Sequence, residues 1–349
     1  MSELAELAAR AGVPAPRLVR GALTAFRHRV RLAVRGRTNN PKLGLFESGS
    51  HRVVHIPSCV VHHPLINDVA RTFRSCLVEQ RISPYSDTAH AGLVRYLQVV
   101  VGRRTQTAQV VVVANDTTPD ALAPLFEMLT ARLGPRLHSL FWNGNPERTN
   151  TILGPHWHAV SGPPSLVEHA DGVNLHYPPG AFGQSNLQLA ETLNQRVRDL
   201  VRGSARVLEL YAGVGAIGLP LAQSASRLEL NELSADSLAG LRLGIADLPS
   251  ELAARVHVLP GPATDATPRI AEADAVIVDP PRRGLDGAVL AALAAAPPAR
   301  LVYVSCGLPS LLTEARALLD AGLVLEGLEA YLMFPFTDHV ETLAWFRKA

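Results

Sequence analysis

The sequence predicts an α/β protein in which a doubly wound, mostly parallel sheet is preceded by an α+β region with antiparallel strands. Three observations carry this prediction. From about residue 171 onward, short apolar runs alternate with segments of helical length, which is typical of a parallel sheet with helices on both faces. A glycine-rich stretch follows the first strand of that series. The front half instead contains strands joined by short polar turns, which favours antiparallel pairing.

Length and composition are those of an ordinary protein with two domains. The chain has 349 residues, of which 47% are hydrophobic and 18% are charged, enough for two substantial cores. No apolar run reaches the ~18–20 residues of a membrane-spanning helix. The N-terminal stretch carries acidic residues and lacks the apolar core of a signal peptide. We therefore expect a cytoplasmic protein, and we expect it to be a monomer.

The cysteines and histidines form no recognisable metal motif. Cys59, Cys76 and Cys306 are too few for a disulfide framework or, alone, for a four-thiolate site. The stretch SHRVVHIPSCVVHHP holds four histidines, but no second cysteine stands at zinc-finger spacing. We expect His51 and His55 to lie on a strand, and we predict no metal site.

Charge divides unevenly between the two halves. Residues 1–170 contain 19 basic and 11 acidic side chains, whereas residues 171–349 contain 14 and 20. Eight arginines and no acid stand between Arg10 and Arg37. A basic front half is typical of a domain that binds a polyanion, although a solvated basic face would have the same composition.

The front half is predicted to contain a helical segment, residues 1–24, and an α+β domain, residues 25–170. Apolar periodicity predicts the following elements. Helices are expected at 3–12, 65–82 and 119–133, and strands at 24–35, from 43, at 93–101, 107–114, 137–142 and 150–153. The pair 93–101 and 107–114 should be antiparallel across a short turn.

The back half, residues 171–349, is predicted to form one domain around a seven-stranded sheet. A loop-rich lead-in over 172–186 precedes a helix at 187–202. Strands are expected at 206–211, 227–232, 255–259, 274–278, 300–305, 323–329 and 340–346. The last two should be antiparallel, because a short connection joins them.

The glycine-rich stretch after strand 206–211 indicates a cofactor site. Gly213 and Gly215 permit a tight turn close to a ligand, and the Lys-Ser/Thr pair of a triphosphate-binding loop is missing. This favours an adenosine cofactor. Glu232 ends the next strand, about 20 residues beyond the loop, where an acid binds ribose hydroxyls. A surface glutamate at a strand end would give the same pattern.

Two later strands are followed by residues that could take part in a reaction. Strand 274–278 is followed by Asp279 and two prolines. The prolines fix the backbone, so that this segment points into the ligand crevice and stays accessible to water. Cys306 follows strand 300–305 and faces the same crevice, which makes it a candidate nucleophile. A lone cysteine after an apolar strand is usually part of a core, but its place beside the Asp-Pro-Pro turn favours the nucleophile.

Five motifs, in this order, closely resemble those of the RNA uracil-5-methyltransferases: FGQSN (182–186), LELYAGVGAIGL (208–219), DPPRRGL (279–285), YVSC (303–306) and FPFTDHVET (334–342). More loosely, the front half resembles the central RNA-contacting domain of this family. The resemblance implies a class I, Rossmann-like methyltransferase domain and S-adenosylmethionine as cofactor. It also implies transfer of a methyl group to carbon 5 of a uridine in structured RNA, rRNA or tRNA.

The resemblance also implies roles for individual residues. Cys306 would be the nucleophile and Glu341 the base that accepts a proton. The positions that match the family's cofactor and substrate contacts are Gln184, Tyr211, Glu232 and Asp279. Carbon 5 of uracil is too poor a nucleophile unaided, so a thiolate must first add to carbon 6, and a base must later remove the carbon 5 proton.

Some relatives bind a four-iron cluster through four cysteines. Cys59 resembles the last of these four, and the other three are missing, so no iron–sulfur cluster is expected. The chain also departs from the family pattern at Ala216, Gly244, Gly307 and Leu308. These departures bear on cofactor affinity rather than on the reaction.

Two alternatives remain open at this point. A methyltransferase for exocyclic amines of RNA or DNA would have an aromatic residue after the two prolines and no nucleophilic cysteine, whereas Arg282 and Cys306 stand here. A catalytically inactive RNA-binding relative would not need both Cys306 and Glu341.

Overall fold

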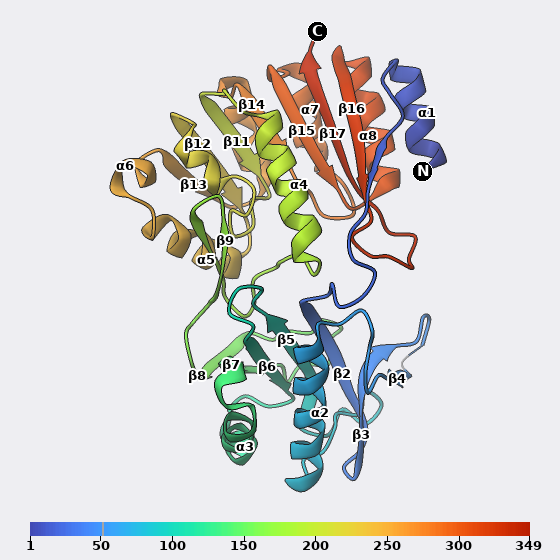
Figure 1. The fold of residues 1–349 in the computed structure, drawn as a ribbon, viewed down its shortest axis with the longest axis vertical. Coiled ribbons are helices and arrows are strands. Elements are labelled where there is room, and N and C mark those ends of the chain that lie inside the picture. The colour runs from blue at the N-terminus through green and yellow to red at the C-terminus, as the bar shows by residue number, and fades with distance from the viewer. Residues whose placement is uncertain (51) are drawn as a thin grey trace. The chain divides into compact units, whose positions relative to one another are not determined.

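The structure, a computed structural model, describes residues 1–50 and 52–349 and divides into two compact units (Figure 1). Unit 1 comprises Met1–Gly21, His169–His176 and Gln188–Ala349, and unit 2 comprises Ala22–Glu168 and Tyr177–Leu187. Each unit is described by itself. His51, which we expected on a strand, lies outside the described residues.

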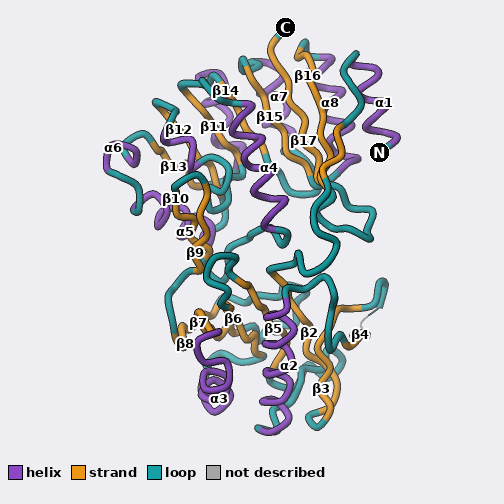
Figure 2. Tube along the Cα trace, in the orientation of Figure 1, coloured by secondary structure: helices purple, strands orange, loops and turns teal. Residues whose placement is uncertain are grey.

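Unit 1 is built on a mixed eight-stranded sheet (Figure 2). Its order is β1-β16-β17-β15-β14-β11-β12-β13. The strands are β1 (Arg17–Val19), β11 (Arg206–Leu210), β12 (Arg227–Glu232), β13 (Val256–Pro260), β14 (Ala275–Val278), β15 (Arg300–Ser305), β16 (Leu323–Tyr331) and β17 (Glu341–Lys348). All neighbours are parallel except that β17 is antiparallel to both β15 and β16. The order reverses between β11 and β14, which is where such sheets open a ligand crevice.

Helices connect these strands as the alternation predicted. They are α4 (Leu187–Leu200), α5 (Ala235–Ala246), α6 (Ser250–Ala253), α7 (Gly287–Ala295) and α8 (Leu308–Asp320), with 3-10 segments η3 (Leu219–Gln223) and η4 (Ala263–Glu272). The lead-in predicted as a loop contains strand β10 (Val173–Tyr177), paired with β9 (Leu166–Ala170). The mostly parallel sheet with connecting helices confirms the predicted α/β fold class.

The sheet has one strand more than predicted, because the N-terminal segment joins it. Helix α1 (Ser2–Ala11) buries Leu4 and Leu7 in the same core cluster as Leu325 and Leu328 of β16. An isolated helix of ten residues is marginal in water, so this packing supplies its stability. Strand β1 then pairs in parallel with β16. Residues 1–21 thus belong to unit 1 rather than forming a segment of their own.

Unit 2 is a seven-stranded sheet in the order β4-β3-β2-β5-β6-β7-β8. Its strands are β2 (Arg29–Arg37), β3 (Asn40–Phe46), β4 (Val53–His55), β5 (Val94–Val101), β6 (Ala108–Ala114), β7 (Leu137–Gly144) and β8 (His156–Ser161). Its helices are α2 (Pro64–Glu79) and α3 (Ala123–Leu133), with η1 (Asp120–Leu122) and η2 (Gly134–Arg136). Both α-helices bury their apolar faces in one core cluster with the sheet.

Unit 2 differs from the prediction in three places. The pair β6 and β7 is parallel, because helix α3 forms the crossover between these strands. The strand predicted to end at residue 35 continues to Arg37, since Gly36 pairs with Pro41 and Arg37 with Asn40 in the ladder. No strand forms at 150–153, and β8 pairs with β7 instead.

Several arginines of the basic N-terminal stretch are internal. Arg35 forms a bidentate ion pair with Asp87, with N–O distances of 2.6 and 2.9 Å, and donates to the carbonyl of Arg95 at 2.8 Å. Its guanidinium also lies 5.0 Å from the ring centre of Tyr85. Arg29 is buried and donates to the carbonyl of Ala181 at 2.9 Å. These two side chains hold unit 2 together and are not available to a polyanion.

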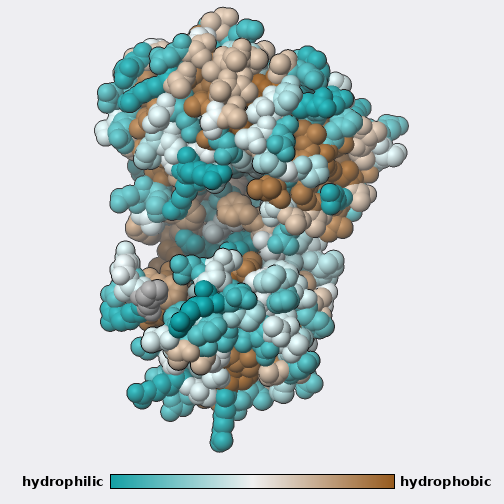
Figure 3. Space-filling model, turned by 180° about the vertical axis from the view of Figure 1, so that it is seen from behind, coloured by the Kyte–Doolittle hydropathy of each residue, from teal (hydrophilic) through white to brown (hydrophobic). Residues whose placement is uncertain are grey.

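The face shown in Figure 3 carries polar side chains with apolar side chains gathered in patches among them. Among the described residues, no helix has the length and hydrophobicity required to cross a bilayer.

Arg35→Ala should lower the free energy of unfolding by about 2–4 kcal/mol, because it leaves the Asp87 carboxylate and the Arg95 carbonyl without their donor. Arg37→Ala, at an exposed position on the same strand, should change it by less than about 0.5 kcal/mol. Urea denaturation measures both. Equal effects would mean that the Arg35 ion pair does not stabilise unit 2.

Candidate active site

Three predicted site residues of unit 1 directly follow strand ends. Tyr211 follows β11, Asp279 follows β14 and Cys306 follows β15. Glu341 reaches the same edge from the opposite direction, because it is the first residue of the antiparallel strand β17. Ser305 pairs with Thr342 across these strands. The structure therefore brings Cys306, Glu341 and Asp279 to one edge of the sheet.

Burial and nearby charges shift the pKa values of these three groups. Burial, reinforced by the charges of Glu341 and Asp279, raises the pKa of the Cys306 thiol to about 11, and Arg282 opposes this shift. Burial raises the pKa of Glu341 to about 7, again against Arg282. Burial and the charge of Glu341 raise the pKa of Asp279 to about 8. At neutral pH the thiol is protonated, and the two carboxyl groups titrate near the pH at which general bases are most effective.

The departure at Gly307 has a steric explanation. A Cβ at this position would overlap the carbonyl oxygen of Arg282. The same oxygen accepts a hydrogen bond from Ser310 Oγ at 3.0 Å. Leu308 then begins helix α8, with a proline in its first turn. Glycine thus lets the Asp-Pro-Pro turn pack directly against the loop that follows Cys306.

A buried carboxyl group, that of Glu314 on α8, ties the same two segments together. Its Oε1 accepts from the backbone N–H of Leu285 at 3.0 Å, and its Oε2 accepts from the Tyr303 hydroxyl at 2.5 Å. Burial raises the pKa of Glu314. The sequence analysis missed this residue. Its signal is a lone acid among the buried apolar positions of α8, between Leu312 and Ala315.

The glycine-rich stretch forms an open loop at the end of β11. Tyr211, Gly213 and Gly215 all have positive φ, of 63°, 59° and 84°. Glu232 accepts from the N–H of Gly213 at 2.8 Å and from that of Ser234 at 2.6 Å. A Cβ built on Gly213 would meet nothing within 4 Å. The loop therefore leaves space beside the backbone of Gly213, where a ligand could lie. The Glu232 carboxylate, which is bonded to this loop, keeps lone pairs that can accept hydrogen bonds from a ligand.

Gln184 is the one predicted site residue that belongs to unit 2. Its segment is bonded to β2 and its flanks, since His28 N donates to Ser185 O at 2.8 Å and Arg29 donates to Ala181 O. Its side chain lines a small cavity together with Arg29 and Tyr177. The compact units thus place residues 177–187 with unit 2, on the other side of the boundary predicted at residue 171.

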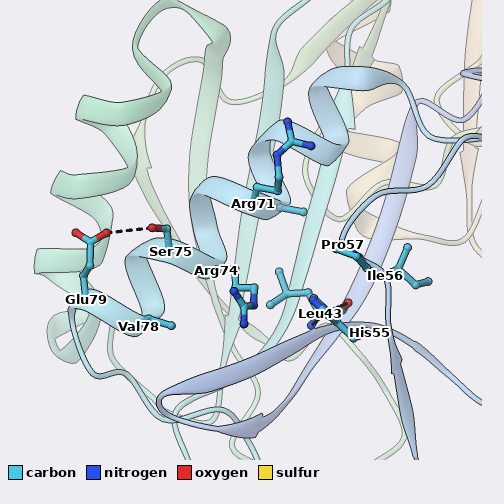
Figure 4. A pocket seen from close by; sticks show the side chains of 10 residues that line it. Leu43, His55, Ile56, Pro57, Arg71, Arg74, Ser75, Val78 and Glu79 are labelled. Carbon is cyan, nitrogen blue, oxygen red and sulfur yellow. Dashed lines mark hydrogen bonds between the residues drawn. The ribbon is translucent and has the colours of Figure 1, made fainter.

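A larger cavity, of about 520 Å³, lies between α2 and strands β3 and β4 of unit 2 (Figure 4). Its polar groups are bonded within the protein. Arg74 Nε donates to Pro41 O at 2.9 Å, and Ser75 Oγ donates to Glu79 at 3.0 Å. Among residues 1–50 and 52–349, no group of three or more His, Cys, Asp or Glu side chains could hold a metal ion.

The fold of unit 1 is that of the class I methyltransferases. The tRNA (uracil-54, C5)-methyltransferase of Pyrococcus abyssi, solved in complex with S-adenosyl-L-homocysteine, has the same fold, with a TM-score of 0.80 and 22% sequence identity. The match covers 99% of this chain and 81% of that one.

Sequence relatives give the family. The model of the family described as tRNA (Uracil-5-)-methyltransferase matches residues 269–349. An uncharacterized RNA methyltransferase of Protochlamydia amoebophila is 37% identical over 341 residues, which is 95% of this chain and 88% of that protein. Another, from Geobacter sulfurreducens, is 31% identical over 332 residues, 91% of this chain and 65% of that one. The chain belongs to the family of these RNA methyltransferases, and its C-terminal segment matches the uracil-5 family model that the motifs predicted.

The charges around Cys306 should control how fast its thiol is alkylated at pH 8. Glu341→Gln and Asp279→Asn each remove a negative charge that raises the thiol pKa, so both should speed alkylation by at least about threefold, since one pKa unit changes the thiolate fraction about tenfold. Arg282→Gln should slow it. Peptide-resolved mass spectrometry after iodoacetamide treatment measures the rate, with buried Cys76 as the internal reference. Equal rates in all three variants would contradict the electrostatic account.

Proposed function

We propose that this enzyme transfers a methyl group from S-adenosylmethionine to carbon 5 of a uridine in rRNA or tRNA, through a covalent bond between Cys306 and uracil. The observation that carries the proposal is the pairing at one sheet edge of a single thiol with a buried carboxyl group of pKa about 7, Glu341. Covalent activation of a pyrimidine followed by proton removal requires one nucleophile and one base.

The sulfur and the base act in sequence on opposite sides of one carbon–carbon bond. Cys306 Sγ bonds to carbon 6, and the electrons of the carbon 5–carbon 6 double bond move toward the carbon 4 oxygen. Carbon 5 becomes nucleophilic and takes the methyl group that the sulfonium of S-adenosylmethionine supplies when bound. Glu341 then accepts the carbon 5 proton, the double bond re-forms, and the bond from sulfur to carbon 6 breaks.

The thiol must lose a proton before it attacks, since its pKa of about 11 keeps it neutral at pH 7. Asp279, whose pKa is about 8, and Glu341 are the carboxyl groups whose charges act on this thiol. Because Glu341 must stay ionised to accept the carbon 5 proton later, we infer that Asp279 takes the thiol proton, so the thiolate forms only when the Asp279 carboxyl group is neutralised. This coupling limits unproductive thiolate in the free enzyme.

The open glycine loop supports the choice of cofactor. Space above Gly213 and the positive φ of Gly213 and Gly215 let a ligand lie against bare backbone. Glu232 would bind the ribose hydroxyls, and Tyr211 and Asp279 would flank the remainder. Gln184, carried by unit 2, stays a predicted contact of the cofactor or substrate. The cofactor, once bound, supplies the electrophilic methyl group.

The charge of unit 2 supports a role in RNA binding. Its residues include 16 arginines and lysines but only 9 acids. Because Arg29 and Arg35 are internal, the RNA-facing charge must come from exposed side chains such as Arg37 and Arg104. Phosphate contacts of this kind give affinity without base recognition.

Removal of the nucleophile and removal of the base should have different consequences. Cys306→Ala should abolish both turnover and any covalent protein–RNA complex. Glu341→Gln should accumulate a complex that survives denaturing electrophoresis and carries the methyl group, because sulfur cannot leave while carbon 5 keeps its proton. Turnover should fall ~10²–10⁴-fold. The assay uses unmodified RNA transcripts and cofactor labelled in the methyl group.

Nucleoside mass spectrometry of the wild-type product identifies the modified base. Label on adenine or cytosine, rather than on 5-methyluridine, would sink the proposal and favour the exocyclic-amine alternative. If Glu341→Gln still binds RNA and S-adenosylhomocysteine but traps no adduct, Glu341 is not the base.

RNA affinity should depend steeply on salt. Each phosphate contact contributes ~0.7–0.9 log units of affinity per log unit of salt. Arg37→Glu combined with Arg104→Glu should therefore lower the slope by ~1.4–1.8. Arg10→Glu combined with Arg316→Glu, the same charge change at exposed positions on α1 and α8 of unit 1, is the matched control. Equal slopes for both variants would show that these unit 2 arginines do not face RNA.

A further inference from the structure

The loop between β16 and β17, residues 332–340, contains an aromatic residue that is both exposed and unfavourable in its backbone conformation. Phe336 is 77% exposed, the largest fraction among the large hydrophobic side chains of the described residues. Its φ is +69°, a region that bulky residues rarely adopt. Exposure and backbone strain both oppose folding, so packing does not explain this residue.

The strain arises from a turn that other residues hold in place. Thr337 N donates to Phe334 O at 3.3 Å, which closes a four-residue turn with Pro335 at its second position. Positive φ at the third position is that of a type II turn, where glycine is usual. Thr337 Oγ1 also donates to Phe334 O at 2.8 Å, and His339 N donates to Thr337 Oγ1 at 3.3 Å. Phe336 thus occupies a turn position at which glycine would have less backbone strain.

Both ends of the loop are fixed beside the base. Tyr331, before the loop, pairs with Glu341, after it. Met333 N donates to Tyr331 O at 2.9 Å. Phe336 precedes Glu341 by five residues, so their Cα atoms are no more than about 17 Å apart. An RNA strand that delivers a uracil to Glu341 has its neighbouring nucleotides within reach of the ring.

We propose that Phe336 stacks on a nucleobase that flanks the target uridine in the RNA, an inference that rests on the function proposed above. Strained residues persist where a ligand gives them a use. Single-stranded bases stack on exposed aromatic rings with little regard to sequence. The other residues at the tip, Thr337, Asp338 and His339, are polar and exposed. A lone ring with a polar surround lacks the contiguous apolar patch that a protein partner would need.

The test measures RNA binding in the absence of turnover, with Cys306→Ala as the parent. Phe336→Gly should weaken binding of a labelled single-stranded RNA of about 15 nucleotides with a central uridine, and of an unmodified tRNA transcript, by about 5- to 100-fold. Affinity for S-adenosylhomocysteine should stay the same. The melting temperature should hold or rise, because glycine adopts positive φ without strain.

Two further variants separate stacking from simple apolar contact. Phe336→Trp should keep wild-type RNA affinity, whereas Phe336→Leu, which keeps apolar surface without a flat ring, should bind as weakly as Phe336→Gly. The stacking role is overturned if Phe336→Gly binds RNA within about twofold of the parent, if Phe336→Leu binds normally, or if weaker binding comes with a lower melting temperature. These measurements need no methyl transfer. A wild-type enzyme that makes no 5-methyluridine would contradict the proposed function, whereas the RNA affinities of the Phe336 variants would still show whether Phe336 stacks on a base.

Discussion

The proposed active site of unit 1 depends on strand β17, which runs antiparallel between β15 and β16. The carboxyl ends of the parallel strands bring Tyr211, Asp279 and Cys306 to one edge, each in the loop that follows its strand. If β17 were parallel to its neighbours as well, its residue at this edge would also lie in a loop. β17 instead places Glu341 at its first position, inside the hydrogen-bonded ladder and only 5% exposed. The ladder thereby gives the proposed base a fixed position beside the thiol.

Desolvation at this edge has a cost and a benefit. Burial of three acidic groups within interaction distance raises the pKa of each, which means that the folded state holds protons that the unfolded chain would release. Stability contributed by the neutral carboxyl groups is therefore lost as the pH rises through their folded pKa values of about 7 and 8. The same burial brings Asp279 and Glu341 into the range where they exchange protons at physiological pH.

The fold class was predictable, and Cys306 and Glu341 could be proposed as a reactive pair, because the signals for both are local in sequence. Strand alternation and short motifs place Cys306 and Glu341 without any knowledge of distant contacts. Long-range contacts produced the errors. Strand β1 has only three residues and exists because β16 accepts it. The segment around Gln184 follows unit 2 because Arg29, far away in sequence, bonds to it.

A charge count overstates the exposed positive charge for a related reason, since it treats every arginine as exposed. Arg35 is instead enclosed by Asp87 and aromatic rings. Glu314 escaped notice because a buried acid on a helix resembles an ordinary surface acid until its partners, Tyr303 and Leu285, are known. In each case the missing information was the tertiary partner, which periodicity does not contain.

The pairing of β1 with β16 also orders events during synthesis. Residues 17–19 leave the ribosome early, yet their partner strand lies at 323–331. At about 5–20 residues per second, the N-terminal segment waits on the order of 15–60 seconds for that strand. Unit 2 lies almost entirely in one continuous stretch, residues 22–187, and is complete long before. The amphipathic α1 remains without its core throughout that interval, so the first helix to be made is among the last to be buried.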